Sequence, residues 1–380
     1  MVRSGHCIER AQKMQSPQPA FARPKKHAHH ISTSATPRPA PQRSLAAQRR
    51  MRYHGVMTET PKDPIVLESE RTFVPADSPA HPHRMSFFAF NTDILLDAWG
   101  DAALAERAFS EAIAACRTFE RLLSRHLPHS DIARINAARG TTVPIDDITY
   151  DVLAASLGYC EASEGCFDIT VGSVLALWNF HTGVIPDQEA LDHALEHVGW
   201  RGVRLGGTPG ARTARMADPL AMVDVGGTAK GYIADRVCEI LAREGLRHFI
   251  VNLGGNVAVF GGKPDGSPFR VGIRDPKNPE GILGAVALET GSFVTSGTTE
   301  RFFERDGVRY HHILNPRTGW PVATDAAAAG IVSRRSFDGD GFSTTLLALG
   351  IERGTEFARS RPEIALAVFV DENNRLSYSR

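Results

Sequence analysis

The chain has 380 residues, 42% of them hydrophobic, and its 43 Lys and Arg equal its 43 Asp and Glu. This length and apolar content are enough for one large core or two smaller ones. A formal net charge of zero gives no general attraction to nucleic acid, and no apolar run is long enough to span a bilayer. We therefore expect neither a nucleic-acid partner nor a transmembrane segment.

The first part of the chain differs in composition from the rest. Residues 1–56 are rich in Lys, Arg, Pro, Ser and Ala but contain one acid, Glu9. Such a segment cannot bury enough apolar surface to fold, so residues 1–84 are predicted to be a disordered extension before a folded domain at 85–380. A basic tail that contacts an anionic partner is the alternative for this segment.

Targeting signals and cysteine usage indicate the compartment. No apolar run of signal-peptide length occurs in the first 60 residues, and none precedes Cys7 as a lipid-attachment site would require. The five cysteines are scattered and form no CxxC pair, which favours a reducing compartment and predicts neither disulfides nor zinc. The expected location is cytoplasmic.

Hydrophobic periodicity predicts helices and short strands in runs. Helices are expected at 102–123, 132–136, 151–163, 186–198, about 229–244 and 340–349. Strands are expected at 93–97, 203, 248–260 with a bend at Gly254-Gly255, 270–274, 284–289, 293–296, 310–314, 327–332, and in a terminal hairpin of 364–370 and 376–378. This order indicates an α+β fold with a largely antiparallel or mixed sheet core and packed helices.

The segment 222–235, Met-Val-Asp-Val-Gly-Gly-Thr-Ala-Lys-Gly-Tyr-Ile-Ala-Asp, reads as a short strand, a turn at Gly226-Gly227 and a helix start. Paired glycines at such a turn let the backbone approach a ligand, and the helix N-terminus favours a phosphate. Asp224 and Lys230 flank the turn as an anchor and a phosphate-pairing cation. A plain strand–turn–helix corner with a surface Lys is the alternative.

Two further stretches carry chemistry-bearing side chains. Asp340 and Thr344 are spaced i, i+4 on a predicted helix, so their oxygens share one face and could hold a hard cation such as Mg²⁺. The alternative is that Asp340 caps the helix and Thr344 packs. His312 lies on an apolar strand before a turn, where it is either a core residue or a base near neutral pH. Glu300 and Arg301 follow Thr295–Gly297, and an exposed, ion-paired edge of the fold explains them as well as a functional role does.

Six motifs occur in one order: Gly165–Gly172, the 222–235 turn, Asn252–Asn256, Thr295–Gly297, His311–Pro321 and Asp340–Thr344. Together they resemble the flavin transferase (ApbE) family, whose members move FMN from FAD onto a protein Ser or Thr. The resemblance covers roughly residues 85–375. The chain departs from the family at Phe90-Asn91-Thr92, where relatives carry Met-Gly-Thr, and at Asn315, where they usually carry Asp.

The resemblance implies a role for particular residues. It places FAD against Phe90, Cys166, Phe167, Asp168, Asp224, Lys230 and Ile313. It places Mg²⁺ on Asp340, Thr344 and a main-chain oxygen of Gly227, and it makes His312 the candidate base. For Asp168, capping of the following turn is the alternative reading from the residues alone.

The expected function is therefore Mg²⁺-dependent transfer of FMN from FAD to a Thr or Ser of a client flavoprotein, with release of AMP. Two alternatives remain open. With water as acceptor the same site would hydrolyse FAD to FMN and AMP, and a protein without catalysis would only bind the flavin.

Overall fold

The structure is a computed structural model that describes residues 31–32 and 71–379. Its centre is a nine-stranded sheet in the order β17-β16-β15-β12-β9-β8-β4-β3-β2, in which every neighbouring pair is antiparallel. The strands are β2 (Thr72–Val74), β3 (His83–Ala89), β4 (Thr92–Trp99), β8 (His248–Leu253), β9 (Asn256–Phe260), β12 (Gly291–Gly297), β15 (Ala326–Ser333), β16 (Ile364–Asp371) and β17 (Leu376–Ser379).

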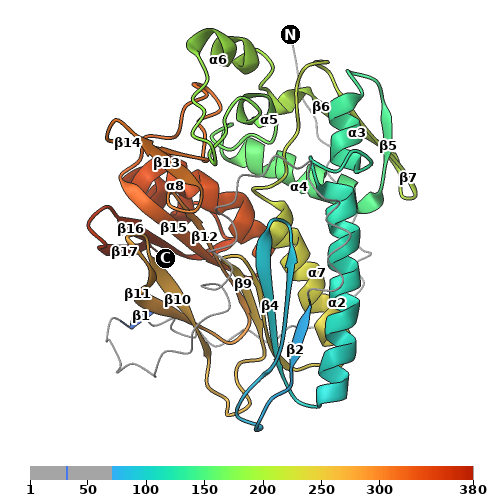
Figure 1. The fold of residues 1–380 in the computed structure, drawn as a ribbon, viewed down its shortest axis with the longest axis vertical. Coiled ribbons are helices and arrows are strands. Elements are labelled where there is room, and N and C mark those ends of the chain that lie inside the picture. The colour runs from blue at the N-terminus through green and yellow to red at the C-terminus, as the bar shows by residue number, and fades with distance from the viewer. Residues whose placement is uncertain (1–30, 33–70, 380) are drawn as a thin grey trace, which may run out of the picture.

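Helices cover one face of this sheet, and a small sheet covers part of the other (Figure 1). The helices are α2 (Ala102–Leu123), α7 (Ala229–Arg243) and α8 (Ser336–Arg359), and the small sheet contains β10 (Phe269–Asp275), β11 (Asn278–Leu288) and β1 (Ile31–Ser32). Strand β16 shows why two cores form. Ala367 and Phe369 pack into the helix-side core, whereas Val368 and Val370 pack with the small sheet, because successive side chains point to opposite faces.

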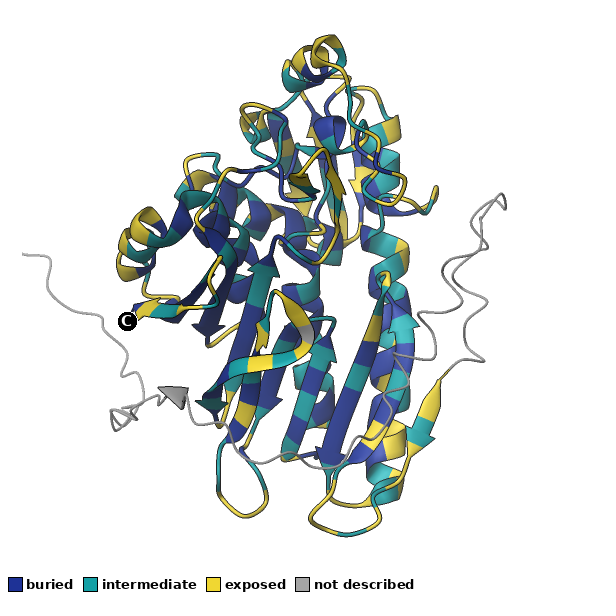
Figure 2. Cartoon of the chain, turned by 60° about the vertical axis from the view of Figure 1, so that its left-hand side comes forward, coloured by how far each residue is buried: buried dark blue, intermediate teal, exposed yellow. Residues whose placement is uncertain are grey.

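A second group of elements lies beyond the end of the large sheet (Figure 1). It contains α3 (Asp131–Ala137), α4 (Asp147–Ala162), α5 (Gly172–Leu175), α6 (Gln188–Leu195), a 3₁₀ turn (Trp200–Gly202), a sheet of β5 (Val143–Ile145), β7 (Ala211–Met216) and β6 (Val203–Thr208), and the hairpin of β13 (Phe302–Arg305) and β14 (Val308–His311). Buried residues run from these elements into the strands of the large sheet (Figure 2).

The α+β prediction is confirmed, and several predicted elements match closely. The helix expected at 102–123 is α2, with the Asp101 carboxylate accepting a hydrogen bond from the Leu104 N–H at 2.8 Å. Ser130 caps α3, because its hydroxyl oxygen accepts from the Ala133 N–H at 3.0 Å. The terminal hairpin is β16–β17. Among the described helices, none combines the length and apolarity that crossing a bilayer requires.

Three predictions about elements were wrong. The described strands begin before residue 85, since β2 is Thr72–Val74 and β3 starts at His83; most of the predicted extension lies outside the described residues. The segment 248–260 is not one bent strand but a hairpin, because Gly254 and Gly255 both have positive φ and reverse the chain. The last helix begins at Ser336 rather than Asp340.

Candidate active site

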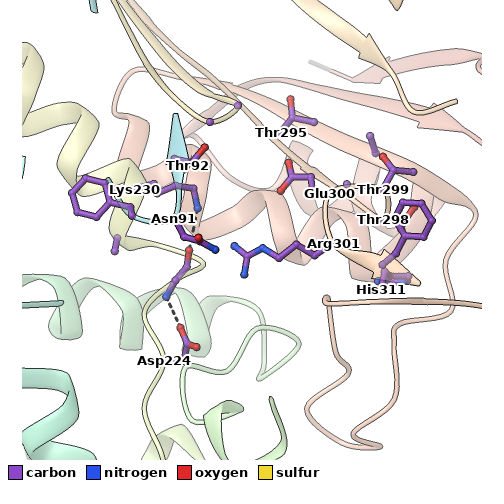
Figure 3. A pocket seen from close by; sticks show the side chains of 18 of the residues that line it. Asn91, Thr92, Asp224, Lys230, Thr295, Thr298, Thr299, Glu300, Arg301 and His311 are labelled. Carbon is purple, nitrogen blue, oxygen red and sulfur yellow. Dashed lines mark hydrogen bonds between the residues drawn. The ribbon is translucent and has the colours of Figure 1, made fainter. Parts of the chain in front are cut away.

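A cleft of about 2770 Å³ opens where the ends of several central strands meet the start of α7 and the β13–β14 hairpin. Phe90, Asp224 and Lys230 are the predicted site residues that line it. Figure 3 shows Glu300 and Arg301 entering this cleft from the segment after β12, together with Lys230 and Asp224. The volume exceeds that of a usual small-molecule pocket, which is about 300–1,000 Å³.

The turn between β3 and β4 places Phe90 at the cleft. Ala89 pairs with Thr92, and the two residues between them, Phe90 and Asn91, have φ values of 52° and 58°. A left-handed Phe is sterically unfavourable, so the turn needs support. The Glu120 carboxylate supplies it by accepting from the Phe90 N–H at 3.0 Å.

The glycine pair of the β8–β9 hairpin meets the same turn. A Cβ on Gly254 would lie 2.1 Å from the Thr92 Oγ1, and Gly254 has a φ of +66°. The turn therefore brings the backbone at Gly254 into close contact with the Thr92 side chain. Glycine is required both for the backbone conformation and for the space.

Asp224 and Lys230 hold the turn before α7. The Asp224 carboxylate accepts from the Gly226 N–H at 2.7 Å and forms an ion pair with the Arg125 Nε at 3.1 Å. The Lys230 Nζ donates to the Gly226 carbonyl at 3.2 Å, which leaves further N–H donors for a ligand. The strand expected before this turn is reduced to a single parallel bridge of Met222 with Val171.

Gly227 and Phe167 come together although sixty residues separate them in sequence. A Cβ on Gly227 would lie 2.9 Å from the Phe167 Cε2, so the glycine admits the aromatic ring beneath the turn. Phe167 is buried, and the Ser163 hydroxyl oxygen accepts from its N–H at 3.1 Å. Cys166 is half-buried beside it, and burial raises the pKa of its thiol.

Asp168 uses its carboxylate within its own turn. One oxygen accepts from the Thr170 N–H at 2.7 Å and from the Thr170 hydroxyl at 2.6 Å, and the other accepts from the Trp200 N–H at 3.2 Å. Burial raises the pKa of this carboxyl, and these hydrogen bonds oppose the shift. The capping alternative therefore describes the Asp168 side chain.

Asp340 lies in α8, one turn after the helix start, and its carboxylate faces α7. The residue is 6% exposed, and its Oδ2 accepts from the Gly231 N–H at 2.8 Å. A Cβ on Gly231 would lie 2.7 Å from the Asp340 Cβ, so glycine lets the two helices approach. Within the described part of the chain, no Lys or Arg forms an ion pair with Asp340, and burial raises the pKa of its carboxyl.

Thr344 follows Asp340 by one helical turn, as predicted. The Ser296 Oγ lies 3.3 Å from the Thr344 Oγ1 and 2.8 Å from the Ser343 Oγ. Two of the six motifs, Thr295–Gly297 and Asp340–Thr344, are thus joined by hydroxyl groups. The backbone of Gly227 belongs to the turn that leads into α7, the helix that contacts Asp340.

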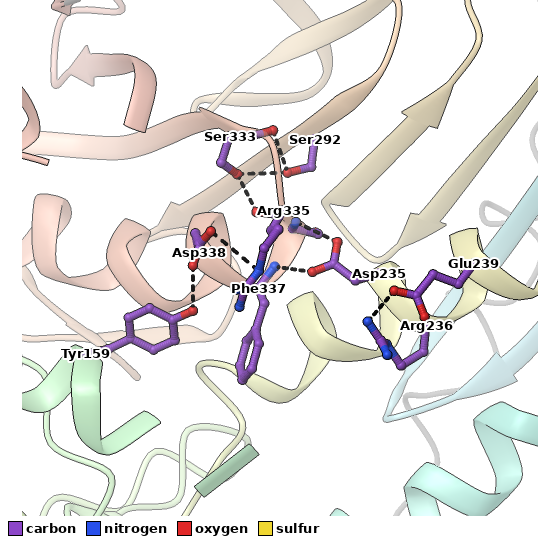
Figure 4. A network of polar contacts seen from close by, with 10 residues as sticks. Tyr159, Asp235, Arg236, Glu239, Ser292, Ser333, Arg335, Phe337 and Asp338 are labelled. Atoms are coloured by element: carbon purple, nitrogen blue, oxygen red, sulfur yellow. Dashed lines mark hydrogen bonds and ion pairs between the residues drawn. The ribbon is translucent and has the colours of Figure 1, made fainter. Parts of the chain in front are cut away.

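The cap of α8 comes from a residue that was not expected there. Asp235 of α7 accepts from the Ser336 and Phe337 N–H groups at 2.7 and 3.0 Å (Figure 4). Asp338 accepts from the Tyr159 hydroxyl at 2.9 Å in the same network. The alternative in which Asp340 caps its own helix is therefore wrong, and these contacts instead fix the helix that carries it.

His312 lies next to His311, which lines the cleft, and one of its ring nitrogens is already engaged. Its Nδ1 is 3.3 Å from the Arg301 carbonyl, which can accept only from an Nδ1–H, so the Nε2 is left with a lone pair. Burial, with the nearby Arg301 cation, lowers the pKa of His312 to about 3, so the imidazole is neutral. Ile313 is buried in the main core and accepts from the Val322 N–H at 3.0 Å.

Glu300 and Arg301 belong to the cleft rather than to an ion-paired edge. Neither forms an ion pair with another residue of the described chain within 4.0 Å. Enclosure by the cleft walls raises the pKa of Glu300, while Lys230 and Arg301 lower it. In the sequence, the one indication of this placement is that both residues lie shortly after the Thr295–Gly297 motif.

A comparison with protein-family models matches residues 90–369 to the ApbE family. The chain belongs to the ApbE family. Relatives of this ApbE chain include the FAD:protein FMN transferase of Treponema pallidum (strain Nichols), 36% identical over 292 residues that cover 73% of this chain and 81% of the relative. Another, from Klebsiella pneumoniae (strain 342), is 32% identical over 283 residues that cover 73% and 85%.

Solved structures share the ApbE fold. The ApbE protein of Thermotoga maritima superposes with a TM-score of 0.72 at 27% identity, covering 79% of this chain and 97% of that one. The Pseudomonas stutzeri flavinyl transferase ApbE in its apo form gives 0.69 at 28% identity, covering 79% and 96%. The family and fold class predicted from the motifs are confirmed.

Proposed function

We propose that this ApbE protein transfers the FMN moiety of FAD onto a Thr or Ser hydroxyl of a client flavoprotein in a Mg²⁺-dependent reaction that releases AMP. The observation that carries the proposal is the Asp340 carboxylate, which is buried and forms no ion pair within 4.0 Å among the described residues, while Lys230 is a nearby cation that attracts it. Burying a carboxylate is costly, and a bound cation would offset more of that cost.

The donor set suits a hard divalent cation. Asp340 offers a carboxylate oxygen, Thr344 a hydroxyl and Gly227 a main-chain carbonyl, and Mg²⁺ prefers such oxygen ligands. The Asp340 Oδ2 is already oriented by the Gly231 N–H. When bound there, Mg²⁺ would neutralise charge on the pyrophosphate during phosphoryl transfer.

Other residues would bind and orient FAD. Lys230 and the N-terminal turn of α7 provide positive charge for the pyrophosphate, and Asp224 is fixed by Arg125 at the same turn. Phe90 lines the cleft, and Cys166, Phe167, Asp168 and Ile313 would form a further wall against the flavin.

His312 would receive the proton of the acceptor. The client hydroxyl oxygen attacks the phosphorus of the FMN half, and the bond from that phosphorus to the bridging oxygen breaks. AMP leaves with the bridging oxygen, and the hydroxyl proton moves to the His312 Nε2, which carries a lone pair because the Nδ1–H is held by the Arg301 carbonyl.

The test is to incubate the protein with FAD, Mg²⁺ and a Thr-containing flavoprotein domain, then to view a denaturing gel under ultraviolet light and quantify AMP. A fluorescent client band with equimolar AMP is expected. FMN and AMP in solution, with a client band that does not fluoresce, would instead identify FAD hydrolysis. Retained, uncleaved FAD would identify a flavin-binding protein.

A further inference from the structure

A group of metal-ligand side chains lies at the end of α6, on elements separate from the cleft residues of the candidate site (Figure 1). His193, Glu196 and His197 each offer one ligand atom, and these atoms all lie within 4.8 Å of one another. The spacing His-x-x-Glu-His places the three side chains on one side of a helical turn. The two imidazole rings are 5.1 Å apart between centroids.

A second observation concerns the orientation of His197. The Asp218 Oδ2 lies 2.8 Å from the His197 Nδ1, from the loop that follows β7. A carboxylate that accepts from one ring nitrogen fixes the tautomer and leaves the other as a metal ligand, an arrangement common around protein-bound zinc. The other nitrogen, Nε2, is buried and has no hydrogen-bond partner within the described part of the chain. An unpaired buried nitrogen is costly, so a ligand for it would stabilise the fold.

We propose that His193, Glu196 and His197 bind a divalent transition-metal ion, with zinc as the best match, and that Asp218 positions His197 for it. Two imidazoles and one carboxylate suit zinc rather than Mg²⁺, which prefers oxygen ligands. Zinc–nitrogen bonds of about 2.0–2.1 Å require ligand atoms roughly 3.4 Å apart, so the side chains must close by about an ångström. His193 and Glu196 can do so because both are exposed, at 69% and 73%.

The site would stabilise the wall behind the His312 turn. Leu191 of α6 is fully buried against Leu314 and Val174, and a Cβ on Gly319 would lie 2.9 Å from the Leu191 Cδ2. Zinc would tie the end of α6 to the Asp218 loop. Metal binding to the native state alone raises the free energy of unfolding, so the melting temperature should rise with zinc.

The test is a calorimetric titration of the full chain with zinc after metal removal, without FAD or Mg²⁺. Every sample carries alanine at His27, His29 and His30, because these imidazoles lie outside the described residues and would bind zinc themselves. The background protein should bind one zinc per chain and gain melting temperature. His193→Ala should weaken binding at least tenfold, and Asp218→Asn by about 10–100-fold as for other outer-shell partners.

His81→Ala is the matched control, because His81 is also exposed and also pairs with a carboxylate, that of Asp77, but has no second imidazole in a ligand cluster of the described residues. Its affinity for zinc should equal that of the background protein. Equal affinity in His193→Ala, or displacement of zinc by an equal concentration of Mg²⁺, would overturn the proposal. Glu196→Gln removes the proposed carboxylate ligand and keeps both imidazoles, so its zinc affinity should also fall below that of the background protein.

Discussion

Replacing Asp340 by Asn separates the metal role of this residue from its structural one. The amide oxygen of Asn can still accept from the Gly231 N–H, so the contact between α7 and α8 is retained. The change removes a buried charge that forms no ion pair within 4.0 Å among the described residues. The Gly231 N–H and the Lys230 cation offset only part of the cost of burying this charge, so the metal-free variant should be more stable than the parent by about 1–3 kcal/mol.

The assay is thermal unfolding with EDTA and with Mg²⁺, together with transfer of FMN to the client. The gain in EDTA corresponds to about 2–5 °C for a domain of this size. Because burial raises the pKa of Asp340, the carboxyl is stabilising when protonated and this contribution is lost as the pH rises through its folded pKa. The advantage of Asp340→Asn should therefore grow with pH, while its Mg²⁺-induced shift and its activity disappear.

Asp338→Asn is the control, since it lies two residues earlier on α8 and accepts from the Tyr159 hydroxyl, which an amide oxygen can also do. This variant should keep both the Mg²⁺-induced rise in melting temperature and transfer. If Asp340→Asn also kept them, the assignment of the metal to Asp340 would be refuted.

Three further predictions concern single residues. Gly254→Ala should lose about 1–3 kcal/mol in chemical denaturation, because its Cβ would lie 2.1 Å from the Thr92 Oγ1 at a φ of +66°; an unchanged midpoint would contradict the close approach. His312→Ala should slow transfer by about 10²–10⁴-fold with FAD affinity retained, and since the pKa of His312 is about 3, the parent rate should show no imidazole limb between pH 5 and 8. Burial raises the pKa of Asp235 to about 6, so its protonated form is stabilising and this contribution is lost as the pH rises from about 4 through 6. The difference in unfolding free energy between the parent and Asp235→Asn, measured in urea, should change by about 2–3 kcal/mol over that pH range. A difference that stays constant with pH would contradict the raised pKa.

Hydrophobic periodicity in the sequence predicted those helices and strands that depend mainly on their own local residues. The helical periodicity of apolar residues along 102–123 predicted α2 with its observed ends, and the i, i+4 spacing of Asp340 and Thr344 correctly placed them on one helix. The reversal at Gly254-Gly255 was missed because a bend and a two-residue hairpin share the same glycines. Only the pairing of β8 with β9 distinguishes the two.

Contacts between distant segments account for the other differences. Asp235 caps a helix that begins 101 residues later, and no local pattern in either segment indicates that contact. Arg301 presents its carbonyl, not its side chain, to the Nδ1 of His312, so the residue type carried no information about this role. Asp168 was expected to face a ligand, but the backbone of its own turn and of Trp200 occupies both of its oxygens.

The glycines of the 222–235 turn explain why several motifs occur together in one chain. The sequence predicts that the Gly226-Gly227 pair lets the backbone approach a ligand, yet protein fills the space beside Gly227 and also beside Gly231, four residues later. Gly227 admits the Phe167 ring, and Gly231 admits the backbone of α8 at Ser336, whose carbonyl oxygen would lie 2.5 Å from an added Cβ. A side chain at Gly227 would displace the Phe167 ring, and one at Gly231 would push α8 away from α7, the helix that carries Lys230. The motif thus acts first as the packing centre that sets the distances among the other motifs, and ligand binding at its exposed side depends on that packing.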